Sequence, residues 1–293
     1  MVSIATYLTT ARRRLIGAGL EPADAAFDAE VLARQALGWS RALFLARVRE
    51  PAPPEFAGRF DPLVARRCRR EPVSQIIGHR EFWGLDIEVS SEVLTPRPES
   101  ELVIETALTE LDPRSGPWRL ADIGTGSGCL AIALAHALPQ AKIAATDVSP
   151  EALEIARRNF HRHRCADRIT LHHTSFLDGL SGPFDVIVSN PPYIRADAAP
   201  SLPPEVREYE PPAALFGGQD GLDPARSLIP SAAARLDQSG CLVMEIGKGQ
   251  PQAVNAIGQK TGLVISRLRH DLQDIPRVVV MRTRGDRLAK GRR

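Results

Sequence analysis

The stretch LADIGTGSGCLAIALA, residues 120–135, changes its hydrophobic pattern abruptly. Its first residues have the pattern of a short buried strand, and its last seven have that of an apolar helix. Gly124, Gly126 and Gly128 lie between the two, and glycine tolerates the positive φ and close backbone approach that such a turn needs. In open α/β sheets the ligand lies at the carboxyl ends of the strands. The stretch therefore predicts an α/β fold with a ligand site at this turn.

Strand-like and helix-like segments alternate through the rest of the chain from here. Such alternation implies a mostly parallel sheet that is covered by helices on both faces. The last two strand patterns are joined by a link too short for a parallel crossover, so we expect that pair to be antiparallel. The prediction is a seven-stranded, mostly parallel sheet. The seven patterns lie at 119–124, 142–147, 168–174, 184–190, 240–247, 262–271 and 275–283.

The region before the sheet has a different pattern. Residues 1–50 show apolar residues at helical spacing, with Gly38 as an expected C-cap. Prolines interrupt this pattern at 50–58, and a short helix is expected to follow. The next segment alternates like a hairpin and turns at a proline pair. We expect three parts: a helical domain over 1–75, a hairpin linker over 76–98 and the α/β domain over 99–293.

Composition narrows the classes of protein that the chain can be. Of its 293 residues, 43% are hydrophobic and 25% are charged, which is typical of globular proteins. Its apolar runs fall short of the roughly 18 residues of a membrane span, and Arg12, Arg13 and Arg14 interrupt any export signal. The four cysteines are scattered without metal-ligand spacing. These features predict a cytoplasmic protein with reduced thiols, no membrane contact and no metal.

The net charge of +2 is unevenly distributed. The net charge is +2 for residues 1–90, −6 for 91–276 and +6 for 277–293. An acidic middle region does not attract a phosphate backbone, so no specific DNA binding is expected. The tail at 282–293 has two interpretations, an RNA contact or a solvated chain end. The usual behaviour of chain ends favours the second.

The glycine turn has features of a nucleoside site. Its spacing is G-x-G-x-G, which differs from the G-x-G-x-x-G of dinucleotide-binding proteins. Asp147 ends the next strand, 19 residues after Gly128, where a carboxylate can accept hydrogen bonds from both hydroxyls of a ribose. These features predict a nucleoside cofactor without a required pyrophosphate. Asp122 either contacts a cationic part of that ligand or caps the loop.

A second motif, NPPY at 190–193, ends another strand of the same sheet. Proline stops a strand and stiffens the segment that follows it. A simple strand end, with Asn190 in a turn and Tyr193 in the core, would explain the motif in isolation. Its position at the same edge of the sheet as the glycine turn and Asp147 favours a functional interpretation.

The segment GTGSG, Asp147 and NPPY together resemble the class I S-adenosylmethionine-dependent methyltransferases that modify planar nitrogens. Residues 71–108 and 206–229 narrow the resemblance to the protein-glutamine methyltransferases of class 1 peptide-chain release factors. The resemblance covers nearly the whole chain. It implies a Rossmann-like catalytic domain, S-adenosylmethionine as cofactor, and an N-terminal domain that recognises the substrate. The substrate would be the glutamine of the release-factor GGQ loop.

The resemblance also implies roles for individual residues. The oxygen of Asn190 and the carbonyl of Pro191 would accept hydrogen bonds from the substrate amide, while Tyr193 packs on its flat face. The stiff prolines would keep these acceptors preorganised. A methyl sulfonium is already a strong electrophile, so neither a metal nor an activated nucleophile is required. The implied cofactor-binding residues are Gly124, Thr125, Gly126, Ser127, Gly128, Asp147, Phe176 and Asn190, and the implied substrate-binding residues are Asn190, Pro191, Pro192 and Tyr193.

Several assignments stay open at this point. Related enzymes often have an acidic residue before the aromatic that packs near adenine, whereas this chain has Ser175 there and Asp178 further on. Glu245 either faces the crevice or caps a loop. The sequence GGQ at 217–219 matches the release-factor motif, and chance in a glycine-rich loop explains it better than self-methylation. Arg97 belongs to a segment that we expect to order the domain junction.

Three other functions compete with release-factor methylation. A ribosomal-protein glutamine methyltransferase would share most motifs. A nucleic-acid adenine methyltransferase would need a base-flipping surface and usually a basic domain, which the acidic middle region disfavours. A catalytically silent binding module for release factors or ribosomes would have no use for both GTGSG and NPPY.

Overall fold

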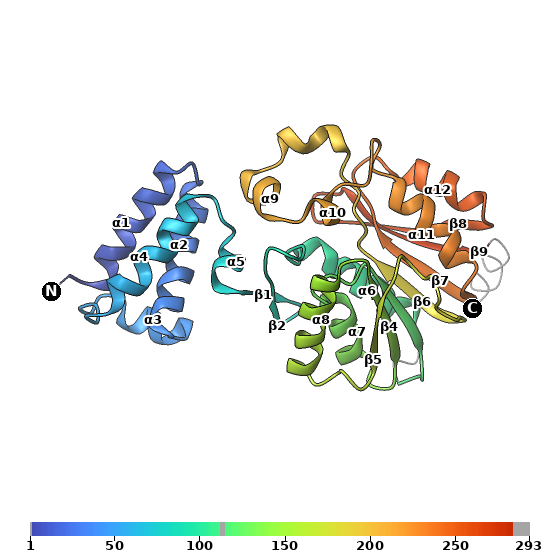
Figure 1. The fold of residues 1–293 in the computed structure, drawn as a ribbon, viewed down its shortest axis with the longest axis horizontal. Coiled ribbons are helices and arrows are strands. Elements are labelled where there is room, and N and C mark those ends of the chain that lie inside the picture. Colours follow the sequence, from blue (N-terminus) through green and yellow to red (C-terminus); the bar gives the residue numbers. More distant parts are fainter. Residues whose placement is uncertain (1, 112–114, 284–293) are drawn as a thin grey trace. The chain divides into compact units, whose positions relative to one another are not determined.

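The computed structural model describes residues 2–111 and 115–283, and the chain forms two compact units (Figure 1). One unit comprises the chain up to His79 together with Pro203–Tyr209. The other comprises Arg80–Leu202 and the chain from Glu210 onward. We call them the helical unit and the sheet unit. The basic tail, from residue 284 onward, lies outside the described residues.

The helical unit packs its helices around an apolar core, as the sequence predicted for residues 1–50. Gly38 ends the second helix with a φ of +66°, which confirms the expected C-cap. The fourth helix begins at Phe56, inside the segment expected to break the pattern. The prolines of that segment all precede the helix, and the Phe56 ring stacks on Phe60 at 4.9 Å. The helices are α1 (Ile4–Gly17), α2 (Pro22–Leu37), α3 (Arg41–Arg47), α4 (Phe56–Cys68), α5 (Val73–Ile77) and α9 (Pro204–Tyr209).

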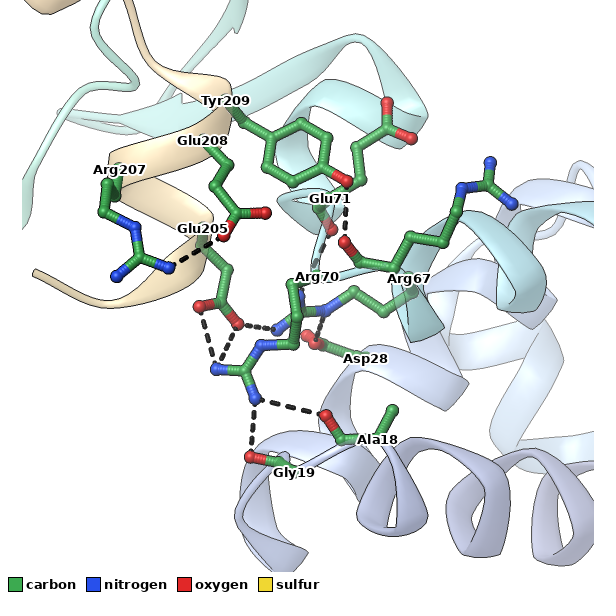
Figure 2. Close-up of polar contacts among 11 residues, drawn as sticks. Ala18, Gly19, Asp28, Arg67, Arg70, Glu71, Glu205, Arg207, Glu208 and Tyr209 are labelled. Carbon is green, nitrogen blue, oxygen red and sulfur yellow. Dashed lines mark hydrogen bonds and ion pairs between the residues drawn. The ribbon is translucent and has the colours of Figure 1, made fainter.

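Helix α9 joins this unit although it begins 127 residues after the end of α5. Figure 2 shows how Glu205 of α9 lies between two arginines of the helical unit. Arg67 Nη2 donates to Glu205 at 3.0 Å, and Arg70 Nη2 donates to it at 2.8 Å. At the end of α9 the Tyr209 hydroxyl donates to the Arg69 carbonyl at 2.6 Å. These polar contacts fix the segment to the end of α4 and the two residues that follow it.

The sheet unit contains the predicted seven-stranded sheet, which confirms the fold class. The strand order is β5-β4-β3-β6-β7-β9-β8, and only β9 runs against its neighbours. The antiparallel final pair is thus confirmed. Strand β7 begins four residues earlier than expected, because Leu236 pairs with Phe184 before an irregularity in the register. The strands are β3 (Arg119–Ile123), β4 (Lys142–Asp147), β5 (Ile169–His173), β6 (Phe184–Ser189), β7 (Leu236–Glu245), β8 (Leu263–His270) and β9 (Pro276–Thr283).

Helices cover both faces of this sheet. Alternate residues of each central strand enter different cores: Leu120 packs with α6–α8, and Ala121 packs with α11 and α12. The two-stranded hairpin β1–β2 adds Phe82 and Ile87 to the first core. Among the described helices, none is both long and apolar enough to cross a lipid bilayer. The bounds are α6 (Glu101–Glu110), α7 (Cys129–Ala137), α8 (Pro150–Arg162), α10 (Pro212–Leu215), α11 (Asp223–Ala233), α12 (Pro251–Gln259), β1 (His79–Phe82), β2 (Leu85–Glu88), and the 3-10 turns η1 (Pro98–Ser100) and η2 (Ala196–Ser201).

The strand order reverses next to β3. From β3 the chain proceeds to β4 and β5 on one side, and then to β6 and β7 on the other. Ligands of open α/β sheets bind where the order reverses, outside the carboxyl ends of the strands. In this chain, the glycine turn follows β3 and the NPPY motif follows β6. The topology therefore brings the two motifs to adjacent strand ends.

Candidate active site

A cavity of about 420 Å³ opens at the carboxyl ends of β3, β4, β5 and β6, within the sheet unit. Both sequence motifs contribute to its wall. Its volume lies in the range of small-molecule sites, which are about 300–1,000 Å³. Lining residues come from the strand ends at 123–127, 146–149, 174–176 and 189–192, from Pro96, Arg97 and Ser100, and from Pro211, Ala213, Ala214 and Phe216.

The glycine turn presents bare backbone to this cavity. Gly124 and Gly126 have φ values of +69° and +55°, and a Cβ placed on either would meet nothing within 4 Å. Gly128, with φ +83°, serves packing instead, since a Cβ there would approach Phe160 at 2.5 Å. Asp147 braces the turn by accepting from the Gly126 N–H at 2.9 Å. The first two glycines thus leave room for a ligand, and the third allows α7 to pack closely on α8.

Asp122 is fully buried below the turn. Its Oδ2 accepts from the Thr125 hydroxyl at 2.7 Å and from the Ala131 N–H at 3.2 Å, so it does cap the loop. Its Oδ1 has no hydrogen-bond partner among the described residues. Burial raises the pKa of Asp122 to about 7, against the lowering effect of the Thr125 hydrogen bond. Both interpretations of this residue are therefore compatible with its position.

The remaining wall on this side suits a nucleoside. Asp147 lies at the end of β4 and lines the cavity, and Phe176 follows β5 in a left-handed conformation with φ +47°. Ser175 also lines the cavity. Asp178 is outside the described lining, and its N–H donates to the Ser175 carbonyl at 3.0 Å. Open glycines and a carboxylate at a strand end fit a ligand with ribose hydroxyls.

The NPPY motif forms a stiff corner of the wall at the end of β6, next to the glycine turn at the end of β3. Asn190, Pro191 and Pro192 line the cavity. The backbone after them is held from two sides: the Ile194 N–H donates to the Leu215 carbonyl at 3.0 Å, and Gln250 Nε2 donates to the Tyr193 carbonyl at 3.2 Å. This corner brings an amide side chain and two prolines to the cavity wall beside the glycine turn.

Tyr193 is placed by its hydroxyl. The hydroxyl donates to Glu245 Oε1 at 3.0 Å, and burial together with the adjacent carboxylate raises the pKa of this tyrosine. The phenol therefore stays protonated and acts as a hydrogen-bond donor. In the described lining of the cavity the motif contributes Asn190 and the prolines, while Tyr193 is anchored towards Glu245.

Sequence reasoning missed Ser100 and left Glu245 undecided. Ser100 lies in the 3-10 turn η1 before α6, and its hydroxyl donates to Glu245 Oε2 at 2.6 Å. Asn190 Nδ2 donates to the same hydroxyl oxygen at 2.8 Å. No local pattern could have revealed this network, because its members lie up to 145 residues apart.

Two other groups near the cavity, the Cys129 thiol and the GGQ segment at 217–219, show no sign of reactivity. Burial raises the pKa of the Cys129 thiol to about 12, so it carries no thiolate nucleophile. The GGQ at 217–219 is part of the scaffold: the Gly217 N–H donates to the Ile194 carbonyl at 2.9 Å, and Gln219 is exposed. Gln219 is outside the described lining of the cavity. Neither group therefore adds a reactive nucleophile to the described lining of the cavity.

Comparisons with known proteins agree with this geometry. A family model described as "Methyltransferase small domain" matches residues 100–202, and one described as "PrmC N-terminal domain" matches residues 6–78. The chain is 44% identical over 256 residues to the release factor glutamine methyltransferase of Moorella thermoacetica, covering 87% of this chain and 89% of that protein. It is 43% identical over 284 residues to the protein of the same name from Bradyrhizobium diazoefficiens, covering 96% and 95%.

A solved structure supports the fold alone. The methyltransferase from Pyrococcus furiosus superposes with a TM-score of 0.51 at 23% identity. The match covers 68% of this chain and 88% of that one.

Proposed function

The chain belongs to the release factor glutamine methyltransferase family, and we propose that it methylates the glutamine of the GGQ motif in class 1 release factors. It is an enzyme, a methyltransferase with the α/β fold described above. The observation that carries the proposal is that Asn190 and Pro191 share one cavity with the glycine turn and Asp147. The methyl acceptor is the side-chain amide nitrogen of the glutamine.

S-adenosylmethionine is the methyl donor that fits this cavity. When bound, it supplies a methyl group on an electrophilic sulfonium. The open backbone at Gly124–Gly126 and the Asp147 carboxylate would hold its sugar, with Thr125 and Ser127 on the same turn. Phe176 would pack on its adenine, and Ser175 is the better placed of the two candidates for the adenine amino group. Asp122 lies buried beneath the turn with Oδ1 unpartnered among the described residues, and its charge would favour the cationic part.

The NPPY corner answers the main chemical difficulty of the reaction. An amide nitrogen is a poor nucleophile because its lone pair is delocalised into the carbonyl. The Asn190 oxygen and the Pro191 carbonyl would accept the two N–H groups of the substrate and favour a pyramidal nitrogen. Its lone pair would then be free to attack the methyl group of the donor. The backbone hydrogen bonds around Ile194 and Tyr193 keep these acceptors in place, so little reorganisation is needed in the transition state.

Proton transfer follows from the same arrangement. The N–C bond forms from the nitrogen lone pair while the donor's S–C bond breaks, which leaves one surplus proton on a strongly acidic nitrogen. That proton leaves after methyl transfer to water, along the hydrogen bonds already made to the corner. A dedicated general base is therefore unnecessary, and the reaction needs no ionised side chain at the acceptor.

The partner is a protein. We place substrate recognition in the N-terminal domain, residues 1–75, with the hairpin linker over 76–98 and the catalytic domain over 99–293. A flexible GGQ loop would enter the cavity, while the helices of the helical unit contact the body of the release factor. We place the enzyme in the cytoplasm, where release factors act and where its four free cysteines stay reduced.

Product analysis tests this proposal. Purified enzyme, labelled S-adenosylmethionine and a recombinant class 1 release factor are incubated, and the GGQ peptide is examined by mass spectrometry. One added methyl on the glutamine is expected, with none on a factor whose motif glutamine is replaced by alanine. Methylation only of a ribosomal protein or of an oligonucleotide, offered in parallel, would overturn the assignment.

A further inference from the structure

The NPPY corner can accept a hydrogen bond from the substrate amide only if the side-chain oxygen of Asn190 faces the cavity. A carboxamide has an accepting oxygen and a donating NH2 of nearly the same size, so both orientations fit the same space. Only the orientation with the oxygen towards the cavity can accept a hydrogen bond from a substrate N–H. In the other orientation two donors would face each other. Neighbouring groups must therefore stabilise one orientation of the Asn190 carboxamide over the other.

The hydrogen bonds behind Asn190 make that choice. Glu245, only 1% exposed, receives the Ser100 hydroxyl on Oε2 at 2.6 Å and the Tyr193 hydroxyl on Oε1 at 3.0 Å. An ionised carboxylate only accepts, so the single proton of Ser100 points to Glu245. The oxygen of Ser100 can then only accept, and Asn190 must present its Nδ2, which lies 2.8 Å away.

We propose that Glu245 and Ser100 are a positioning pair that holds the Asn190 oxygen towards the methyl acceptor. This inference rests on the proposed function, since it assigns the pair a role in that same reaction. Neither residue need touch the reacting atoms. Glu245 makes the Ser100 hydroxyl donate to it, and Ser100 can then only accept from the Asn190 NH2 group. Tyr193 donates to the second oxygen of Glu245, so that the carboxylate cannot rotate away.

The geometry favours the ionised carboxylate. A distance of 2.6 Å is typical of an O–H···O⁻ hydrogen bond, whereas neutral pairs are usually longer. Burial raises the pKa of Glu245, while Ser100, Tyr193 and the cation Arg277 on β9 lower it and Glu99 raises it. Protonation of Glu245 would free the Ser100 proton and permit the wrong orientation of Asn190.

The first test removes the hydroxyl. In Ser100→Ala we expect kcat for the release factor to fall by roughly tenfold to a hundredfold, as for loss of a preorganised polar contact, with an unchanged Kd for S-adenosylmethionine. Ser100→Thr keeps the hydroxyl and should restore most of kcat. Thr106→Val is the matched control, because it removes a buried hydroxyl of α6 that donates only to the Leu102 carbonyl. Equal kcat in Ser100→Ala and wild type would overturn the proposal.

The second test reverses the polarity of the pair. In Asn190→Asp, two carboxylates compete for the one Ser100 proton, and kcat should fall by about a hundredfold or more. Adding Glu245→Gln lets the new amide donate to Ser100, so that Ser100 donates to Asp at position 190 and the second Asp oxygen faces the substrate. The double variant should therefore be at least about tenfold faster than Asn190→Asp. A double variant that only multiplies the two single losses would contradict the assigned polarity.

A measurement without substrate separates this proposal from the proposed function. In NMR spectra of the free enzyme, the hydrogen-bonded Nδ2 proton of Asn190 should exchange slowly with solvent. That protection should disappear in Ser100→Ala and persist in Thr106→Val. Protection that survives in Ser100→Ala would refute the pair whatever the substrate is, whereas absent methyl transfer by the wild type would refute only the proposed function.

Discussion

Two glutamates of this molecule, Glu205 and Glu245, have opposite kinds of hydrogen-bond partner. Glu205 in the helical unit is flanked by the guanidinium groups of Arg67 and Arg70 (Figure 2). Glu245 in the sheet unit is more deeply buried and is directly hydrogen-bonded by two neutral hydroxyls, those of Ser100 and Tyr193. The two arginines neutralise the charge of Glu205. The charge of Glu245 has no such partner in direct contact among the described residues and instead orients the two hydroxyl groups.

Their pKa values move in opposite directions for that reason. Burial alone would raise the pKa of Glu205, but the hydrogen bonds from Arg70 and Arg67 outweigh it and lower the pKa. Burial dominates at Glu245 and raises its pKa, because its hydroxyl donors compensate only in part. We infer that Glu205, whose charge is paired with two arginines, stabilises the fold. Among the described residues Glu245 is directly hydrogen-bonded only by hydroxyl groups, so we expect its charge to lower the stability of the fold while it serves the reaction. Substitutions at these residues therefore test whether the two carboxylates differ in this way.

Arg67→Met should have the largest effect on stability. Arg67 Nε donates to the buried Asp28 at 2.6 Å, and its Nη2 donates to Glu205. Removing the cation leaves Asp28 buried without its partner, which typically costs about 3–5 kcal/mol of unfolding free energy. Urea unfolding of the full chain measures it. Arg47→Met, which breaks only an exposed pair with Glu50, is the control and should change little.

Neutralising the two glutamates should have smaller effects of opposite sign. Glu205→Gln loses charge-assisted hydrogen bonds and should lower Tm by a few degrees, for about 1.5 kcal/mol. Glu245→Gln removes a buried charge that no directly bonded cation matches, and should raise Tm by about 2–4 °C while lowering kcat. Calorimetry at neutral pH checks both. A lower Tm in Glu245→Gln would mean that this carboxylate stabilises the fold after all.

The pH dependence of the same two variants checks the cause. Glu205 has a lowered folded-state pKa, so its contribution is present above the ordinary carboxyl pKa and is lost as pH falls through the lowered value. Glu245 has a raised pKa, so the wild type is relatively most stable at acid pH and loses stability as pH rises through the raised value. Both Tm differences from wild type should therefore vanish on acidification, that of Glu245→Gln at the higher pH.

The sequence alone does not predict most of this contrast between the surroundings of Glu205 and Glu245. Strand periodicity and the glycine turn predicted the sheet and its ligand end, because those signals lie within a few consecutive residues. The association of Glu205 with α4 depends on side chains 138 residues apart, and nothing near Pro204–Tyr209 indicates it. Ser100 lies next to the proline pair at which the sequence predicted a turn, and only the three-dimensional structure shows its hydrogen bond with Asn190. Long-range polar partners are set by the completed fold.

The smallest effect is expected at Gln219, the glutamine of the chain's own GGQ. Its loop is fixed by the Gly217 hydrogen bond to Ile194, and its side chain is exposed away from the described cavity lining. Gln219→Ala should leave kcat unchanged, and wild-type enzyme incubated with cofactor alone should gain no methyl on this residue. Intact-mass spectrometry measures the second outcome directly. A self-methylated Gln219 would show that the loop leaves its position and enters the cavity.

The most direct test of the account is the single-turnover rate of methyl transfer by Asn190→Ala. Enzyme in excess over release factor, saturated with S-adenosylmethionine, isolates the chemical step from binding. Loss of a preorganised acceptor predicts a rate lower by about a hundredfold to a thousandfold, with cofactor and release factor still bound. A single-turnover rate equal to that of the wild type would contradict the claim that the Asn190 oxygen prepares the amide for transfer.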